Sequence, residues 1–170
     1  MRWIWIDRFT EFESRRRAVA VKNLTLAEEH LHDHFPGYPI MPASLIMEGM
    51  AQTAGILVGE AHQFEEKVIL AKIRRAVFHG YAVPGDRLRY EADIESADQD
   101  DPVPRAGCAT VGRVFKNDEA EPMAEIGIMF SHIDQNMSGL DFPEENFVFT
   151  EDFKALLHMY QLAGPSTDRT

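Results

Sequence analysis

HFPGYPIMPASLIMEG, residues 34–49, decides the fold of this chain because it joins a proline-rich loop to an apolar segment. Each of its three prolines removes a backbone donor and biases the preceding residue towards extended geometry. The spacing predicts a stiff extended loop over residues 34–42. Pro42 suits the start of a helix, because the first amides of a helix have no intrahelical acceptor. We therefore expect one long helix over residues 43–59.

The expected helix is apolar on nearly every side, which is typical of a buried helix. Its polar residues Ser44, Glu48 and Gln52 are four positions apart and fall along one stripe. We expect the Glu48 carboxyl group to be buried, and among apolar neighbours it favours the neutral form, which can donate a proton. The helix also carries small residues that let another group approach its backbone closely: Gly49, Ala51, Ala54 and Gly55.

Strand patterns surround the expected helix. Residues 2–7 predict a short strand or a packed N-terminal arm, and residues 15–25 predict a strand. Further strands are expected over 67–78, 83–94, 106–115 and 123–130. The second of these alternates Leu88, Tyr90, Ala92 and Ile94, and a turn at Asn117-Asp118 joins the last two. One buried helix among antiparallel strands favours an α+β domain in which the sheet curls around the helix.

The tail after about residue 132 has a different pattern. Thr150 is a plausible N-cap, and Phe153, Leu156, Leu157 and Tyr160 follow helical spacing. We therefore divide the chain into a domain over 1–133 and a C-terminal extension over 134–170. The extension carries a helix near 150–163, packed on the domain or on a neighbouring subunit.

Composition restricts the function further. The net charge of −11 argues against binding to nucleic acid, and no apolar run is long enough for a membrane-spanning helix. The single cysteine, Cys108, suits a reducing compartment, and no signal peptide is recognisable, so we expect a cytoplasmic location. Acidic runs over 91–101 and 141–145 are typical of solvated loops.

His34 and Glu48 could form an acid–base pair. A histidine accepts a proton near neutral pH, and a neutral carboxylic acid can protonate a leaving hydroxyl group. The backbone amide at the helix start, near Ala43, could polarise a carbonyl group. From the residues alone the alternative stays open that His34 is a hydrogen-bonded interior histidine and Glu48 a structural partner.

The longer stretch HFPGYPIMPASLIMEGMAQTAGIL, residues 34–57, resembles the signature of the bacterial (3R)-hydroxyacyl-[acyl-carrier-protein] dehydratases of fatty acid synthesis. The resemblance covers roughly residues 5–131. It implies the hotdog fold, in which a curved antiparallel sheet wraps a long helix, and a hydro-lyase that forms a trans-2-enoyl thioester. A glutamate at position 48 resembles the branch that dehydrates without isomerising. Asp33 and Ala43 each stand where the family usually has glycine.

The resemblance also implies roles for individual residues. His34 and Glu48 would be the catalytic pair, contributed by opposite subunits of a homodimer. The amide of Ala43 would bind the oxyanion, and the carbonyl of Ile40 would orient the histidine. The substrate-binding residues would be Gln52, Phe35 and Gly37.

Partners follow from the same resemblance. The substrate would arrive on the phosphopantetheine arm of acyl carrier protein, an acidic partner expected to dock on Arg74, Arg75 or Arg16. No metal or organic cofactor is expected. The homodimer would have shared active sites, and many relatives form trimers of dimers.

Other functions are possible for the same residues. The runner-up is another hotdog acyl-thioester enzyme, an enoyl hydratase or a thioesterase, or a non-catalytic acyl-binding subunit. His30, His32 and His34 alternate and would share one face of a strand, as metal ligands sometimes do, but no cysteine or carboxylate set completes a site.

Overall fold

The computed structural model describes residues 3–96, 98, 100–104, 106–133, 146 and 148–163. The elements along the chain are β1 (Arg8–Glu13), β2 (Arg17–Asn23), α1 (His30–Asp33), α2 (Ala43–Glu60), β3 (Lys67–Phe78), β4 (Arg87–Glu95), β5 (Cys108–Lys116), β6 (Ala124–Ile133) and α3 (Glu151–Ala163). The long helix and the strands from β2 to β6 lie close to where the sequence predicts them, whereas β1 was not expected.

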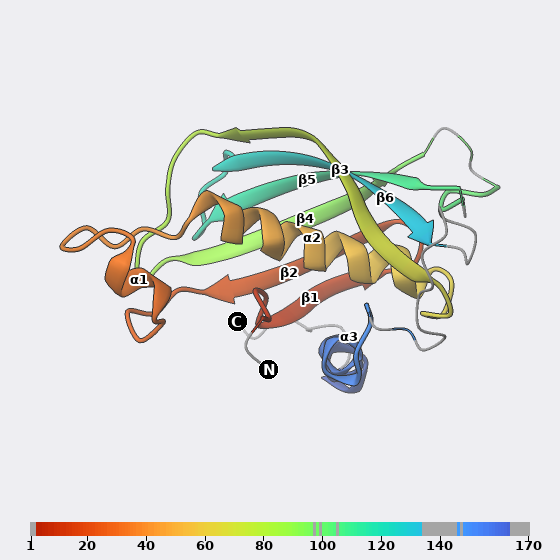
Figure 1. The fold of residues 1–170 in the computed structure, drawn as a ribbon, viewed down its shortest axis with the longest axis horizontal. Helices are drawn as coiled ribbons and strands as arrows, with labels where there is room; N and C mark the ends of the chain where they lie inside the picture. Colours follow the sequence, from red (N-terminus) through yellow and green to blue (C-terminus); the bar gives the residue numbers. More distant parts are fainter. Residues whose placement is uncertain are drawn as a thin grey trace.

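The strands form one six-stranded antiparallel sheet with the order β1-β2-β4-β5-β6-β3. Helix α2 lies along the concave face of this sheet (Figure 1). The strand that follows α2 in the chain, β3, pairs with the last strand, β6, and so becomes an edge of the sheet. This is the hotdog arrangement, and it confirms the predicted α+β fold.

Helix α2 is buried because apolar side chains surround its second half. Every residue from Gln52 to Gly59 is buried, and Met50 and Leu57 belong to the main hydrophobic core. Strand β4 supplies part of the surface that faces α2. Its alternating residues Leu88, Tyr90 and Ala92 are completely buried, as the sequence pattern predicts. None of the described helices is long and apolar enough to cross a bilayer.

The N-terminal residues form a packed arm rather than a strand. Trp5 and Ile6 are buried before β1 begins at Arg8. Two hydrogen bonds attach the arm to α2, because the side-chain amide of Gln52 accepts from the amide of Trp5 at 2.8 Å and donates to the carbonyl oxygen of Trp3 at 2.9 Å. The arm is therefore held over the middle of the helix.

Two sequence patterns form a different structure from the one considered for them. Residues 30–33 form the short helix α1, so the three histidines do not share one face of a strand. The acidic run from residue 91 begins inside β4, where buried Glu91 lies 2.9 Å from the guanidinium of Arg17 and 3.5 Å from that of Arg113. These arginines on neighbouring strands compensate the buried charge, which a count of acidic residues cannot reveal. The acidic run over 141–145 lies outside the described residues.

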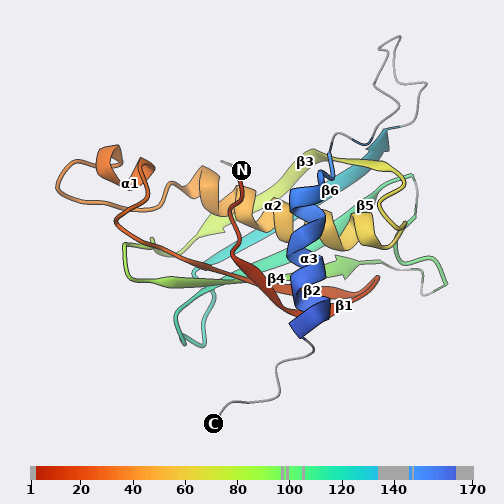
Figure 2. The same ribbon diagram turned by 90° about the horizontal axis from the view of Figure 1, so that it is seen from below.

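The C-terminal helix α3 contacts β1 and α2, and Figure 2 shows it lying across the elements on that side of the molecule. Its predicted apolar face is turned inward, because Leu156 and Leu157 are buried in the main core. Phe153 and Tyr160 pack against the same core.

Candidate active site

His34 lies at the start of the proline-rich loop, directly after α1. Its ring nitrogen Nδ1 is 3.1 Å from the carbonyl oxygen of Ile40, the contact that the resemblance implies. If Nδ1 donates to this carbonyl, Nε2 carries the lone pair and can accept a proton. The backbone amide of Ile40 donates in turn to the carbonyl oxygen of His34 at 2.8 Å, so both ends of the loop are held together.

The tip of the loop is compact rather than extended, which corrects the sequence-based expectation. The amide of Phe35 donates to the carbonyl oxygen of Tyr38 at 3.0 Å, and the amide of Tyr38 donates back to Phe35 at 2.9 Å. Gly37 turns the chain with a φ of 76°, a conformation that other residues rarely adopt. The ring of Phe35 stacks on His34 at 4.2 Å and is 53% exposed, so this loop presents apolar surface beside the imidazole.

Glu48 lies one turn before Gln52 on α2, and the two side chains are in contact. Gln52 Nε2 donates a hydrogen bond to Glu48 Oε1 at 2.9 Å. This contact leaves Oε2 as the oxygen that can carry a proton. In the single chain the Glu48 side chain is half-buried rather than buried as expected, because it faces a pocket instead of the packed core.

The first turn of α2 begins with backbone amides that have no acceptor within the helix. Pro42 is the N-cap, and its carbonyl oxygen accepts from the amides of Leu45 at 2.9 Å and Ile46 at 3.2 Å. Ala43 precedes the first amide that has an intrahelical acceptor, so its N–H has no partner within the helix. An amide in this position is suited to bind a developing negative charge.

A pocket of about 260 Å³ lies beside Glu48. One side is a face of α2, on which Glu48, Ala51, Gln52 and Gly55 follow successive turns. Strands β3 and β6 and the residues before and within α3 supply its other walls, which are apolar. Among its lining residues Glu48 is the ionisable group.

The single chain does not bring His34 and Glu48 together. His34 does not line the pocket beside Glu48, and no contact described for residues 3–133 joins the two side chains. Each group is instead held by its own neighbour, Ile40 for the imidazole and Gln52 for the carboxyl group.

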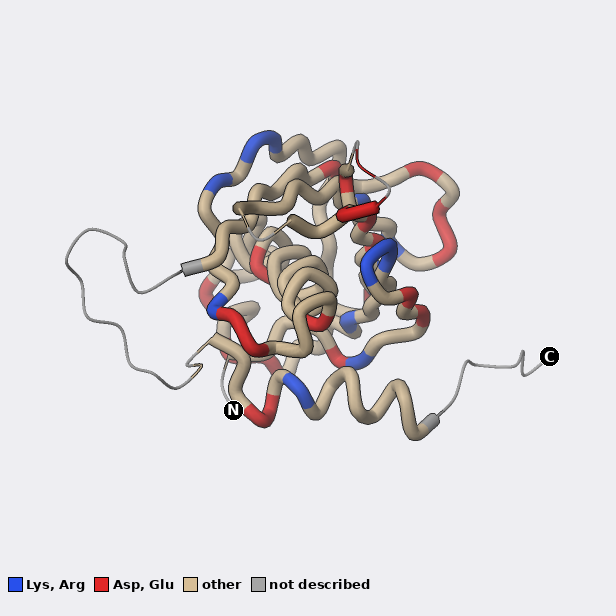
Figure 3. The backbone as a smooth tube through the Cα atoms, turned by 90° about the vertical axis from the view of Figure 1, so that its right-hand side faces the viewer, with Lys and Arg blue, Asp and Glu red and all other residues tan. Residues whose placement is uncertain are grey.

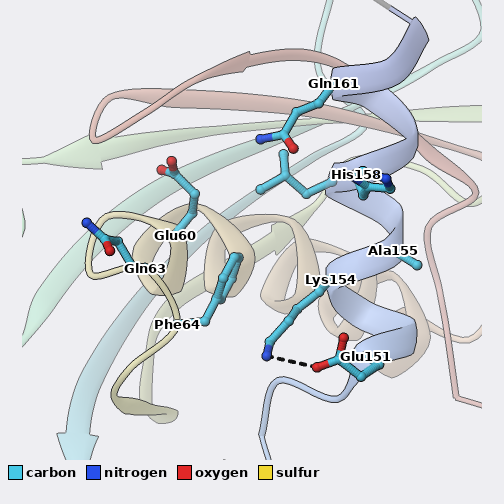
Figure 4. Close-up of a pocket in the computed structure, with 9 residues that line it drawn as sticks. Glu60, Gln63, Phe64, Glu151, Lys154, Ala155, His158 and Gln161 are labelled. Carbon is cyan, nitrogen blue, oxygen red and sulfur yellow. Dashed lines mark hydrogen bonds and ion pairs between the residues drawn. The ribbon is translucent and has the colours of Figure 1, made fainter.

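A second hollow of about 550 Å³ lies between the end of α2 and α3 (Figure 4). Its rim is polar, and Lys154 Nζ donates to Glu151 Oε1 at 3.1 Å across part of it. None of the residues to which the sequence assigns a catalytic or substrate-binding role lines this hollow. Of the residues with an expected catalytic or substrate-binding role, Glu48 and Gln52 line the pocket beside Glu48 instead.

The predicted docking arginines lie on two segments of the chain, and both segments reach the end of β4, where Arg74 pairs with Glu95 and the amide of Ile94 donates to the carbonyl oxygen of Arg16 at 2.9 Å. Arg16 follows β1 at one edge of the sheet, whereas Arg74 and Arg75 lie on β3 at the opposite edge. Figure 3 likewise shows Lys and Arg at separate places around the molecule. Each of the three has an acidic partner, since Arg16 pairs with Glu13 at 2.9 Å, Arg75 with Glu125 at 3.2 Å and Arg74 with Glu95.

The structure provides no cluster for a metal ion among the residues it describes, where no group of three His, Cys, Asp or Glu side chains converges. His32 Nε2 lies 2.8 Å from the carbonyl oxygen of Leu26, and His30 packs against the ring of Trp5.

Sequence reasoning missed the residues that complete the pocket beside Glu48. Trp3 comes from the N-terminal arm, Phe130 from β6, and Val148 and Phe153 from the C-terminal segment. The small residues of α2 were the one available sign of a pocket on this helix, because Ala51 and Gly55 line it. Nothing in the local sequence indicates which distant segments face them.

Comparison with known proteins places the chain in a family. A family model of the FabA-like domain matches residues 3–120. The 3-hydroxyacyl-[acyl-carrier-protein] dehydratase FabZ of Koribacter versatilis is 44% identical over 91 residues, which cover 52% of this chain and 58% of that protein. The match thus spans less than two thirds of this relative.

The enzyme of the same name from Listeria monocytogenes is 33% identical over 130 residues, which cover 76% of this chain and 85% of the relative. Among solved structures, the dehydratase heterocomplex ApeI:P from Xenorhabdus doucetiae shares the fold, with a TM-score of 0.58, 11% identity and coverage of 79% of this chain and 86% of that chain. The family model and the Listeria match together show that the chain belongs to the FabA-like family of 3-hydroxyacyl-[acyl-carrier-protein] dehydratases.

Proposed function

We propose that the protein removes water from (3R)-3-hydroxyacyl-[acyl-carrier-protein] and forms the trans-2-enoyl thioester in fatty acid biosynthesis. The observation that carries the proposal is the Glu48 carboxyl group, which accepts a hydrogen bond from Gln52 at 2.9 Å and lines an apolar pocket. A proton donor beside an apolar cavity matches what the leaving hydroxyl group of a 3-hydroxyacyl chain requires. Membership of the dehydratase family supports the same reaction.

The reaction needs one base and one acid. His34 Nε2 takes the proton from the carbon next to the thioester carbonyl, and the released electron pair forms the carbon–carbon double bond. The bond from the third carbon to oxygen breaks as Glu48 gives its proton to the hydroxyl group, which leaves as water. Transfer of a proton from the imidazolium to the carboxylate through solvent restores both groups.

Backbone groups support these steps. The amide of Ala43 donates to the thioester oxygen while negative charge develops on it, and the carbonyl of Ile40 stabilises the imidazolium through Nδ1. Gln52 holds the carboxyl group of Glu48, and Phe35 and Gly37 shape the loop that borders the thioester. Because the elimination is complete with these acid–base steps, we expect no metal or organic cofactor.

A homodimer would complete the site. Strand β3 is an edge strand of 12 residues that exposes apolar Leu70 and Ile73, and such an edge is a template for pairing with a second copy. Leu70 also lines the pocket beside Glu48, so a partner at this edge would lie next to the carboxyl group. We propose that His34 of one subunit faces Glu48 of the other.

The remaining assignments follow from the family. Acyl carrier protein delivers the substrate and docks on one of the two basic clusters, Arg74 with Arg75 or Arg16. The protein acts in the cytoplasm. Residues 1–133 form the dehydratase domain, and residues 134–170 form an extension to it.

The test of this function follows the absorbance of the enoyl product from 3-hydroxyacyl thioesters. His34→Ala and Glu48→Gln are each expected to lower kcat by about 10²–10⁴-fold, the usual contribution of an acid–base group. Glu151→Gln is the matched control and should keep the wild-type rate, because it makes the same carboxyl-to-amide change at an exposed glutamate on α3 that does not line the pocket beside Glu48. Wild-type rates in both His34→Ala and Glu48→Gln would refute the assignment.

The same two variants test the shared site. In a mixed two-fold dimer of His34→Ala and Glu48→Gln chains, one site has both residues altered and the other has both intact. Refolding the variants together in equal amounts should therefore restore about a quarter of the wild-type activity. No recovery in a mixture shown to contain mixed dimers would mean that both residues act from one chain.

A further inference from the structure

The pocket beside Glu48 is lined in part by residues that lie outside the matched family domain. The FabA-like model ends at residue 120, yet Val148, Phe149 and Phe153 line the pocket. They face the stripe of α2 that begins at Glu48 and continues to Gly55. The C-terminal extension is thus part of the cavity wall and not only a cover for the core.

The extension is fixed to the domain by the side chain of Asn146. Its Nδ2 donates to the carbonyl oxygens of Phe64 at 2.8 Å and Glu66 at 2.9 Å, just after α2. Its Oδ1 accepts from the amides of Val148 at 3.1 Å and Phe149 at 3.2 Å. All the polar groups of one amide therefore anchor the residues that reach the pocket.

Phe149 occupies a slot that exists only because residue 59 is glycine. A Cβ atom at Gly59 would lie 2.3 Å from Cζ and 2.6 Å from Cε2 of the Phe149 ring. The ring is 5% exposed and meets Phe64 edge to face at 5.0 Å. Since Gly59 follows Glu48 by 11 residues, this wall lies about 16 Å along the helix axis from the carboxyl group.

The pocket has the character of a site for a hydrocarbon chain. Apart from Glu48 and Gln52 at one end, its walls are aliphatic and aromatic, and its volume is about 260 Å³. Apolar walls of this kind favour the methylene groups of an acyl chain over a polar group.

We propose that the C-terminal extension sets the acyl chain length of the substrate, with Phe149 and Phe153 as the specificity-determining residues. This inference rests on the proposed function, because it takes the pocket beside Glu48 to hold the acyl chain. The chain enters past Glu48, follows Ala51 and Gly55 along α2, and ends against the two rings. The extension thus limits the reaction to chains that fit the space it encloses.

Three substitutions change the pocket without altering His34 or Glu48. Phe153→Ala removes part of the wall. Gly59→Ala displaces the Phe149 ring from its slot. Gly55→Ala narrows the pocket by one methyl group, which meets Phe130 Cε1 at an ordinary 3.5 Å. Leu162→Ala is the matched control, because Leu162 lies on α3, is 74% exposed and does not line the pocket.

The measurement is kcat/KM on a series of 3-hydroxyacyl-pantetheine thioesters of increasing chain length, with each variant normalised to its own four-carbon substrate. Phe153→Ala should extend the profile to longer chains. Gly59→Ala should change the length at which the profile ends, because the displaced Phe149 ring lines the pocket. Gly55→Ala should lower kcat/KM about fourfold for each methylene group that loses its place at the long end. Leu162→Ala should match wild type. Superimposable profiles in all four variants would overturn the inference.

A binding series separates this inference from the proposed reaction. Alkyl-pantetheine thioethers, which lack the hydroxyl group and cannot react, are titrated into the same variants by calorimetry. If wild type is inactive at every chain length, the proposed reaction is wrong. A shift between variants in the longest alkyl chain that binds would still support the role of the extension. Unchanged alkyl affinities refute that role. If Phe153→Ala or Gly59→Ala does not fold, Phe153→Leu and Gly55→Ala provide the same comparison.

Discussion

Two glycines on α2 give a prediction in which the same substitution has opposite effects. At Gly55 a new Cβ meets only the ring edge of Phe130, at 3.5 Å and 3.9 Å. At Gly49 a new Cβ would lie 2.7 Å from both Cζ and the hydroxyl oxygen of Tyr90, and 3.1 Å from the carbonyl oxygen of Trp5. Tyr90 is completely buried and so has no solvent-facing position to move into.

The magnitudes follow from these contacts. Replacing glycine by alanine inside a helix raises the free energy of unfolding by about 0.8–1 kcal/mol through helix propensity, and this gain applies at both positions. Overpacking a filled core costs about 1–3 kcal/mol, which applies at Gly49 alone. Gly55→Ala should therefore stabilise the protein by about 1 kcal/mol, whereas Gly49→Ala should be neutral or destabilised by about 2 kcal/mol. The difference between the two variants isolates the overpacking cost, because the helix propensities cancel.

Urea unfolding followed by circular dichroism, at one fixed protein concentration, measures both variants. The slope of the free energy against urea should be unchanged, so that the midpoint alone reports the stability. Equal stability of Gly49→Ala and Gly55→Ala, or a greater stability of Gly49→Ala, would refute the packing argument. It would mean that Tyr90 or the N-terminal arm can move away from α2 at little cost.

Two predictions concern titratable groups away from the active site. Burial lowers the pKa of His30. The unfolded chain therefore takes up a proton near pH 6.5 that the folded protein binds only at lower pH, so the free energy of unfolding should fall as the pH drops below about 6.5. This decrease should be smaller in His30→Gln. Urea titrations of both proteins at pH 7.5 and 5.5 compare these decreases, and equal decreases would contradict the role of His30. Burial also raises the pKa of the Cys108 thiol to about 11, so iodoacetamide at pH 8 should alkylate the native protein about 100-fold more slowly than the urea-unfolded chain. Similar rates in the two states, measured by mass spectrometry, would show that the thiol is accessible and ionised in the fold.

Much of the fold was predictable because its signals are local. The apolar run after Pro42 predicted α2, whose bounds in the structure are Ala43–Glu60. The alternation from Leu88 predicted the buried face of β4. Helix α1 was not predicted, because its four residues are too few to show helical periodicity.

In the candidate site, too, contacts within one helix were predictable and contacts between distant segments were not. Glu48 and Gln52 are neighbours through helical spacing alone, so their contact was implicit in the sequence. The contact between His34 and Ile40 depends on how the proline-rich loop closes, and it was expected only from the family resemblance. Glu91 was predicted to lie in a solvated loop, whereas it is buried in β4. The arginines that compensate its charge lie on other strands, so the local sequence does not reveal them.

The sequence by itself determined α2, α3 and the strands from β2 to β6, because backbone hydrogen bonding and side-chain periodicity act over a few residues. It also placed a carboxyl group and its amide partner on one face of a buried helix. Only the tertiary structure decided what faces that helix. Trp3, Phe130 and Phe153 meet around the pocket from three distant parts of the chain. Their meeting depends on the summed packing of the whole core, in which each contact is weak and no local pattern specifies the partner.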